Sequence, residues 1–132
     1  MQARGSILIL DDEKRWVRFC KSVLERYGYS VDATASVDVC KNWLQNRSYD
    51  LVLVAGYLDE YVPREGVRAV RAIYPACKVV VLGAAPDGED VRQAFLLGAW
   101  DCVPREYSEH GLLDMVKKAS GINRWLRAEA EG

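Results

Sequence analysis

The 132-residue sequence lacks the features that would place it in several large functional classes. Its formal net charge is −1 at pH 7, so no excess of positive charge favours nucleic acid or an anionic membrane surface. No apolar run approaches the ~20 residues that a membrane-spanning helix needs. The polar start from Met1 to Gly5 also argues against a secretory signal peptide. We therefore expect a cytoplasmic protein that binds neither nucleic acid directly nor a membrane.

Cysteine and histidine are too few and too scattered to suggest a zinc site. No C-x-x-C spacing occurs, and His110 is the only histidine. We interpret His110 as a solvated residue beside a helix start rather than a catalytic base. Free cysteine behaves as a small hydrophobic side chain, so we expect reduced core thiols. The four cysteines are Cys20, Cys40, Cys77 and Cys102.

What the sequence does contain is an alternation of short apolar strands with amphipathic helices. Five such units joined by right-handed crossovers predict a single α/β domain, a doubly wound five-stranded parallel sheet with helices on both faces. The expected strands are Ser6–Leu10, Tyr29–Ala35, Leu51–Ala55, Val79–Leu82 and Trp100–Val103. The expected helices are Glu13–Tyr27, one that Ser36 caps and that ends at Asn46, Gly66–Ile73, Asp87–Leu97 with Gly98 as its cap, and a last one that Ser108 caps.

The C-terminal segment is set apart by its composition. Gly121 is expected to end or weaken the last helix, which predicts a domain over residues 1–119 and a tail or linker over 120–132. Trp125 and Leu126 are large apolar residues in this otherwise polar segment. Such residues are suited to dock on their own domain, on a second copy or on a following module.

Two acidic residues follow the first strand directly. The stretch "ILILDDE" places Asp11 and Asp12 where the carboxyl end of a parallel strand faces the ligand crevice. Carboxylates argue against a phosphate cradle, which needs glycines and backbone N–H groups. They suit a hard cation such as Mg²⁺ instead. Glu13 is better explained as an acidic residue at a helix N-terminus, where the helix dipole favours it.

The third strand ends without a reactive side chain. In "DLVLVAGYL" the apolar run Leu51–Val54 is followed by Ala55 and Gly56, so the strand brings only a methyl group and a hydrogen to the crevice. A methyl group cannot accept a phosphoryl group, and no nearby Ser, Cys or His has an obvious activating partner. We therefore expect no enzyme activity.

Together these stretches resemble the receiver domain of two-component response regulators, roughly from Ser6 to Ala119. "ILILDDE" is similar to the family's first strand and acid pair, "YDLVLVA" to its third strand and "GAWDCVPRE" to its fifth. The resemblance implies the flavodoxin-like receiver fold and a phosphoryl switch. In that switch an Asp ending the third strand is phosphorylated, the acid pair holds Mg²⁺, and a Ser or Thr and a Lys grip the phosphoryl group.

Carried over position by position, the resemblance leaves only the acid pair in place. An engineered Asp-to-Ala change at residue 55 would not explain the other departures, so we interpret the site as naturally degenerate. The acid pair is Asp11 and Asp12, while Ala55 stands for the acceptor Asp, Gly83 for the Ser or Thr, Arg105 for the Lys, Glu106 for the Pro after it, and Cys102 for the switching aromatic residue.

The altered site leads to specific expectations. Arg105 at the mouth of the acid pocket should form a bidentate pair with Asp11 or Asp12, so that Mg²⁺ binding is weak or absent. Asp59 and Glu60 lie too far past the third strand to act as substitute acceptors. The peptide bond after Arg105 should be trans, because a cis bond before a residue other than proline costs about 2.5–4 kcal/mol.

The resulting hypothesis is a pseudo-receiver, an atypical and phosphorylation-independent signalling domain of a bacterial regulator. It would act through protein–protein interaction or dimerisation. The resemblance implies the fourth and fifth helices as the partner face, and Trp125 and Leu126 would add to it. The alternative is a degenerate pocket that binds a small molecule or a metal as regulatory input.

Overall fold

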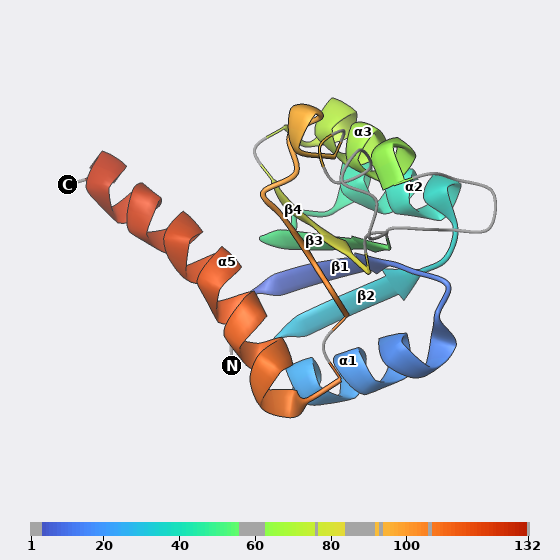
Figure 1. The fold of residues 1–132 in the computed structure, drawn as a ribbon. Coiled ribbons are helices and arrows are strands. Elements are labelled where there is room, and N and C mark those ends of the chain that lie inside the picture. Colours follow the sequence, from blue (N-terminus) through green and yellow to red (C-terminus); the bar gives the residue numbers. More distant parts are fainter. Residues whose placement is uncertain are drawn as a thin grey trace.

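Parallel strands and helices alternate along the chain, and the sheet order is β2-β1-β3-β4-β5 (Figure 1). This confirms the expected fold class. The computed structural model describes residues 4–55, 63–75, 77–83, 92, 94–105 and 107–131, without the side chains of 63–65 and 121–131. The strands are β1 (Ser6–Leu10), β2 (Ser30–Thr34), β3 (Leu51–Ala55), β4 (Lys78–Leu82) and β5 (Asp101–Val103), and the helices are α1 (Lys14–Arg26), α2 (Val37–Asn46), α3 (Pro63–Ile73) and α5 (Glu109–Glu131).

Each face of the sheet is covered by its own helices, as Figure 1 shows. Buried side chains of α2 and α3 pack on one face, and those of α1 and α5 pack on the other. Successive strand residues point to opposite faces, so β1 sends Leu8 and Leu10 to the α2–α3 side and Ile7 and Ile9 to the α1–α5 side. Both faces are therefore buried, which explains why these strands read as continuous apolar runs.

Helix ends follow the capping chemistry that the sequence predicts. The Ser36 hydroxyl accepts a hydrogen bond from the amide of Val39 at 3.2 Å, and the Ser108 hydroxyl accepts one from the amide of Gly111 at 3.0 Å. Both serines thus satisfy an amide in the first turn of a helix. Gly28 follows the end of α1 with φ of +94°, a left-handed conformation that favours glycine.

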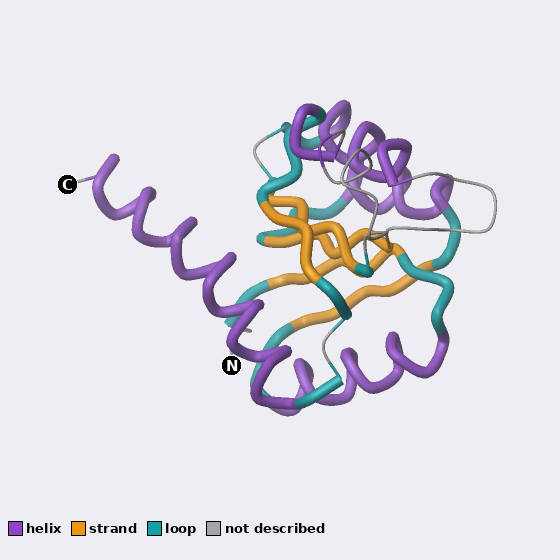
Figure 2. The backbone as a smooth tube through the Cα atoms, in the orientation of Figure 1, coloured by secondary structure: helices purple, strands orange, loops and turns teal. Residues whose placement is uncertain are grey.

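Two helices are longer than expected. α3 begins at Pro63 rather than Gly66, because proline is tolerated in the first turn of a helix. α5 runs to Glu131, so the expectation that Gly121 ends it is wrong. A glycine inside a helix costs only about 1 kcal/mol relative to alanine, and the residues after it are mostly good helix formers. The segment set apart as a tail therefore continues α5, whose far end projects beyond the sheet (Figure 2).

Much of the expected fourth helix lies outside the described residues. Residues 92 and 94–96 are helical. Gly98 has φ of +103° and donates its amide to the carbonyl of Phe95 at 3.0 Å, as expected of a glycine cap. Within the described ranges, no helix combines the length and the apolar character needed to cross a membrane.

Three of the four cysteines are core residues. Cys20, Cys40 and Cys77 are buried. Burial raises the pKa of the Cys20 and Cys77 thiols to about 12 and that of Cys40 to about 11. Almost no thiolate is present at neutral pH, so these side chains act as small hydrophobic residues. Cys102 is only half-buried.

Candidate functional site at the carboxyl edge of the sheet

The carboxyl ends of four strands meet at one edge of the sheet. Strand register places Leu10 beside Val54, Ala55 beside Leu82, and Leu82 beside Val103. The residues that follow these strand ends are consequently close in space although they are far apart in sequence. In a parallel sheet this edge is where ligand-binding groups gather.

A buried ion pair occupies this edge. Arg105 donates from Nε to Oδ2 of Asp11 and from Nη2 to Oδ1 of Asp11, both at 2.9 Å. The side chain of Asp11 is 0% exposed and that of Arg105 is 22% exposed. This is the bidentate pair that the sequence predicts, and its acid partner is Asp11. The hydrogen bonds to Asp11 raise the pKa of Arg105 above its ordinary value, so the guanidinium remains charged.

Asp11 has little capacity left for a further ligand. Its Oδ1 also accepts a hydrogen bond from the amide of Glu13 at 2.9 Å, so both carboxylate oxygens have donors. Glu13 is the N-cap of α1, as expected, and its Oε1 accepts from the amide of Arg15 at 3.3 Å. Asp12 is partly exposed and forms no ion pair with the described part of the chain. The described residues also contain no cluster of three His, Cys, Asp or Glu side chains that could hold a metal ion.

Gly83 makes room for the arginine. A Cβ atom placed on Gly83 would lie 2.9 Å from Nη1 and 3.5 Å from Cζ of Arg105. The φ angle of Gly83 is +60°, which side-chain-bearing residues rarely adopt. Its amide donates to the carbonyl of Val103 at 2.9 Å and so ties β4 to the end of β5. The absence of a side chain at residue 83 and the presence of arginine at residue 105 are therefore one linked arrangement.

The other expected site positions contribute less. Ala55 is buried at the end of β3 and offers only its methyl group. Cys102 packs against the cluster beneath α2 and α3 and forms no described hydrogen bond with Asp11 or Arg105. The residue pair Asp59 and Glu60, and the peptide bond from Arg105 to residue 106, lie outside the described residues. The structure thus brings together three predicted residues, Asp11, Gly83 and Arg105.

Comparison with known families identifies the family of the chain. Residues 7–117 match the response regulator receiver domain. The chain belongs to the response regulator receiver family. The matched range runs from the second residue of β1 into the first part of α5, so it includes every strand end of the candidate site.

Known relatives of this receiver domain include a longer protein. The transcriptional regulatory protein CpxR homolog of Haemophilus influenzae is 29% identical over 116 residues, which are 86% of this chain and 49% of that protein. The chain thus spans about half the length of this relative. The structure of NtrX from Brucella abortus has a TM-score of 0.87 at 18% identity, covering 99% of this chain and 29% of that one. A CheY-like receiver domain from Methanospirillum hungatei has a TM-score of 0.83 at 22% identity, with both chains covered completely (100%). Both structures share the fold.

The receiver domain also contains contacts that the sequence did not suggest. Glu109, the first residue of α5, accepts hydrogen bonds from Arg26 Nη2 at 3.0 Å and from the Tyr27 hydroxyl at 2.8 Å. At the start of β4, Lys78 Nζ is shielded from solvent, has no hydrogen-bond partner among the described residues and lies 5.0 Å from the centre of the Trp100 ring. No local sequence motif predicts either contact, because the partners are 22 to 83 residues apart and only the fold brings them together.

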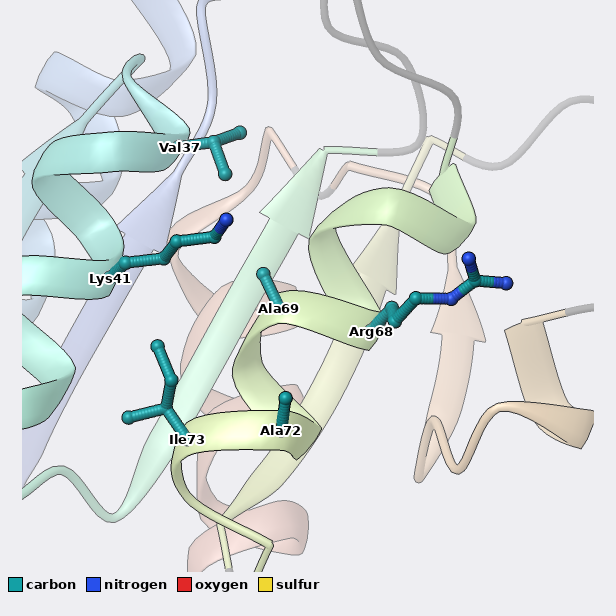
Figure 3. Close-up of a pocket in the computed structure, with 6 residues that line it drawn as sticks. All are labelled: Val37, Lys41, Arg68, Ala69, Ala72 and Ile73. Atoms are coloured by element: carbon teal, nitrogen blue, oxygen red, sulfur yellow. The ribbon is translucent and has the colours of Figure 1, made fainter.

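A separate groove of about 330 Å³ lies between α2 and α3 (Figure 3). Val37 and Lys41 extend from α2 toward Ala69 and Ile73 of α3, and Arg68 and Ala72 complete the lining. Neither Asp11 nor Arg105 lines this groove, so the groove is distinct from the carboxyl-edge site. The described residues that line it are mostly aliphatic, and none of them is acidic.

Proposed function

We propose that this chain is a phosphorylation-independent receiver domain whose acid pocket is occupied by its own arginine. The observation that carries the proposal is the Asp11–Arg105 pair, with both contacts at 2.9 Å. By the family resemblance, Asp11 would help to hold Mg²⁺. Here both of its oxygens already accept hydrogen bonds, Oδ2 from Arg105 and Oδ1 from Arg105 and the amide of Glu13. Mg²⁺ loses its hydration shell reluctantly, so it competes poorly for such a carboxylate.

The remaining positions support the same proposal. Ala55 offers no oxygen that could accept a phosphoryl group, and Gly83 offers no hydroxyl that could bind one. Phosphoryl transfer depends mainly on positioning and charge neutralisation, and the groups that would supply both are absent from these positions. Cys102 is also too small to report a state by moving between buried and exposed positions. Ala55, Gly83 and Cys102 thus offer no group that would contact a phosphoryl group in one state and not in the other. The domain would therefore act as a fixed signalling module without enzyme activity.

The test is to expose the chain to Mg²⁺ and a small phosphodonor, then to beryllofluoride, and to record intact mass and amide spectra. We expect no added phosphoryl mass and no spread of chemical-shift changes through the sheet. Ala55→Asp, which restores a carboxylate alone, should give changes confined to the pocket. A receiver with a complete set of family residues serves as positive control. Phosphorylation of the native chain, or shifts that spread through it, would overturn the proposal.

The alternative function is binding of a small molecule or a metal in the acid pocket as regulatory input. It requires Arg105 to leave Asp11. A metabolite thermal-shift screen and calorimetric titration with Mg²⁺ test this alternative. Binding to the native chain that Asp11→Asn abolishes would favour it over a fixed module.

The proposed partner is a second copy or another protein, and the proposed setting is a cytoplasmic bacterial regulator. Phe95, Leu96 and Tyr107 are exposed large apolar residues near the C-terminal end of the expected fourth helix and before α5, where they support a docking surface. The side chains of Trp125 and Leu126 lie outside the described residues. The name of the Haemophilus influenzae relative supports a role in transcription regulation. The contribution of α5 to association is tested by light scattering. The native chain is compared with a variant in which Trp125 and Leu126 are both changed to Ser.

A further inference from the structure

The connection between β5 and α5 is tied to both ends of α1. Arg105, near its start, binds Asp11, which lies three residues before α1 begins. Glu109, at its end, binds Arg26 and Tyr27, the last residue and the C-cap of α1. The two attachments lie at opposite ends of a 13-residue helix. Such a helix is about 20 Å long.

The length of the connection leaves little slack between the two attachments. Four residue steps separate Arg105 from Glu109, and four steps reach at most about 14 Å even in a fully extended chain. The side chains must bridge the remaining distance along α1. Because only four residue steps join the two attachments, a shift of the backbone at Arg105 is expected to move the segment that carries Glu109. This short connection is the basis for the coupling inferred below.

We propose that the two attachments act as a clamp that sets the position of the first turn of α5, and that the Asp11–Arg105 pair controls this position. This inference rests on the proposed function, because it names what the occupied acid pocket regulates. The pocket has lost the phosphoryl chemistry of the family in this proposal, but it keeps a mechanical connection to the last helix. That connection runs through Arg105 rather than through a bound phosphoryl group.

The two attachments differ in strength. The Asp11–Arg105 pair is buried and bidentate, whereas Glu109 and Arg26 are exposed to 40% and 61% at their side chains. Exposed pairs are weakened by solvent and salt. Arg105 is therefore the dominant attachment, and Glu109 mainly sets the direction in which α5 starts. Further along, α5 is held by apolar burial of Leu112, Val116 and Ala119, so the clamp governs the first turn and not the whole helix.

Hydrogen exchange of the full chain tests the clamp. The reporters are the amides of Gly111 and Leu112, which donate to the hydroxyl and the carbonyl of Ser108, each at 3.0 Å. We expect Arg105→Ala to speed exchange of both amides about tenfold, a change of about 1.4 kcal/mol in opening, and to leave Ala119 unchanged. The matched control is Arg47→Ala, which removes another Arg–Asp pair at 2.9 Å, on Asp32, remote from α5. Unchanged exchange of Gly111 and Leu112 in Arg105→Ala would overturn the inference.

A second variant keeps the test decisive if Arg105→Ala folds poorly. Glu109→Gln weakens the exposed attachment and leaves the buried pair intact. We expect it to speed exchange of the same amides about threefold in the native chain, and more strongly when combined with Arg105→Lys. Equal fold-changes in the two backgrounds would show that the attachments act independently and would contradict the clamp. Phosphorylation of the native chain would defeat the proposed function but would leave these exchange results standing.

Discussion

Arg105 and Lys78 are cations at opposite edges of the same sheet, and their surroundings differ. Arg105 follows β5 at the carboxyl edge and donates two hydrogen bonds to Asp11. Lys78 begins β4 at the amino edge, where the partner of its shielded Nζ in the described part of the chain is the Trp100 ring, at 5.0 Å from the ring centre. Hydrogen bonding to Asp11 raises the pKa of Arg105, while desolvation lowers the pKa of Lys78.

The difference shows what each edge requires of a cation. At the carboxyl edge, the buried carboxylate of Asp11 needs a partner, and arginine supplies a planar fork that matches both of its oxygens. At the amino edge no carboxylate pairs with Lys78 among the described residues, and the aromatic face offsets only part of the cost of shielding the ammonium. Changes at the two edges should therefore alter stability in opposite directions.

The largest effect is expected from Asp11→Ala. The change leaves the Arg105 guanidinium partly buried without its acid partner. Breaking a buried pair in this way costs about 3–5 kcal/mol. The 22% exposure of the Arg105 side chain places our expectation near the lower end, at about 3 kcal/mol. Urea unfolding measures the loss, and a loss below about 1 kcal/mol would show that the pair behaves as an exposed one.

An intermediate effect is expected from Gly83→Ser, which introduces a side chain with a hydroxyl at this position. A side chain at φ of +60° is strained, and its Cβ would lie 2.9 Å from Nη1 of Arg105. We expect a loss of about 1–3 kcal/mol in the free energy of unfolding. Part of this loss is steric, so it should shrink when Arg105→Ala is also present. A double-mutant cycle measures the coupling, and strict additivity would contradict the linked arrangement of these two residues.

A smaller effect of opposite sign is expected from Lys78→Met. The change replaces a shielded ammonium that has no hydrogen-bond partner among the described residues with an apolar chain of similar length. It thereby removes a desolvation cost, so stability should rise by up to about 1 kcal/mol. In the native chain, the pKa of Lys78 is lower in the folded state than in the unfolded state. At pH values between these two pKa values, the unfolded state therefore binds more protons than the folded state. Stability should accordingly increase with pH across that window, and Lys78→Met should remove this slope. A destabilised variant would show that the Trp100 contact outweighs desolvation.

The smallest effect is expected from Mg²⁺ on the native chain. Millimolar Mg²⁺ should leave its melting temperature unchanged, because Arg105 occupies Asp11. Arg105→Ala frees that carboxylate beside Asp12, so this variant should show a measurable increase in melting temperature with Mg²⁺. Differential scanning fluorimetry compares the two proteins directly. An equal increase in both would show that the arginine does not compete with the metal.

Several elements of the fold could be predicted from the sequence because their signals are local. The run Leu51–Val54 predicts a strand buried on both faces, and Ser36 and Ser108 predict helix starts, as found. Gly121 misled the prediction, because one glycine does not outweigh the helix formers that follow it in α5. The sequence predicted that Arg105 pairs with either Asp11 or Asp12. It could not decide between them, because the choice of Asp11 depends on strand register and side-chain direction.

By itself, the sequence determined the kinds of group available at each position. It established an acid pair after β1, no functional side chain at Ala55 and Gly83, and an arginine after β5. The tertiary structure decided which groups meet: parallel pairing placed Asp11 beside Arg105, and packing of α1 against α5 placed Glu109 on Arg26. The physical reason is that residue type sets what a group can bind, whereas contacts between residues more than 80 positions apart depend on the register of strands and the packing of helices over the whole fold.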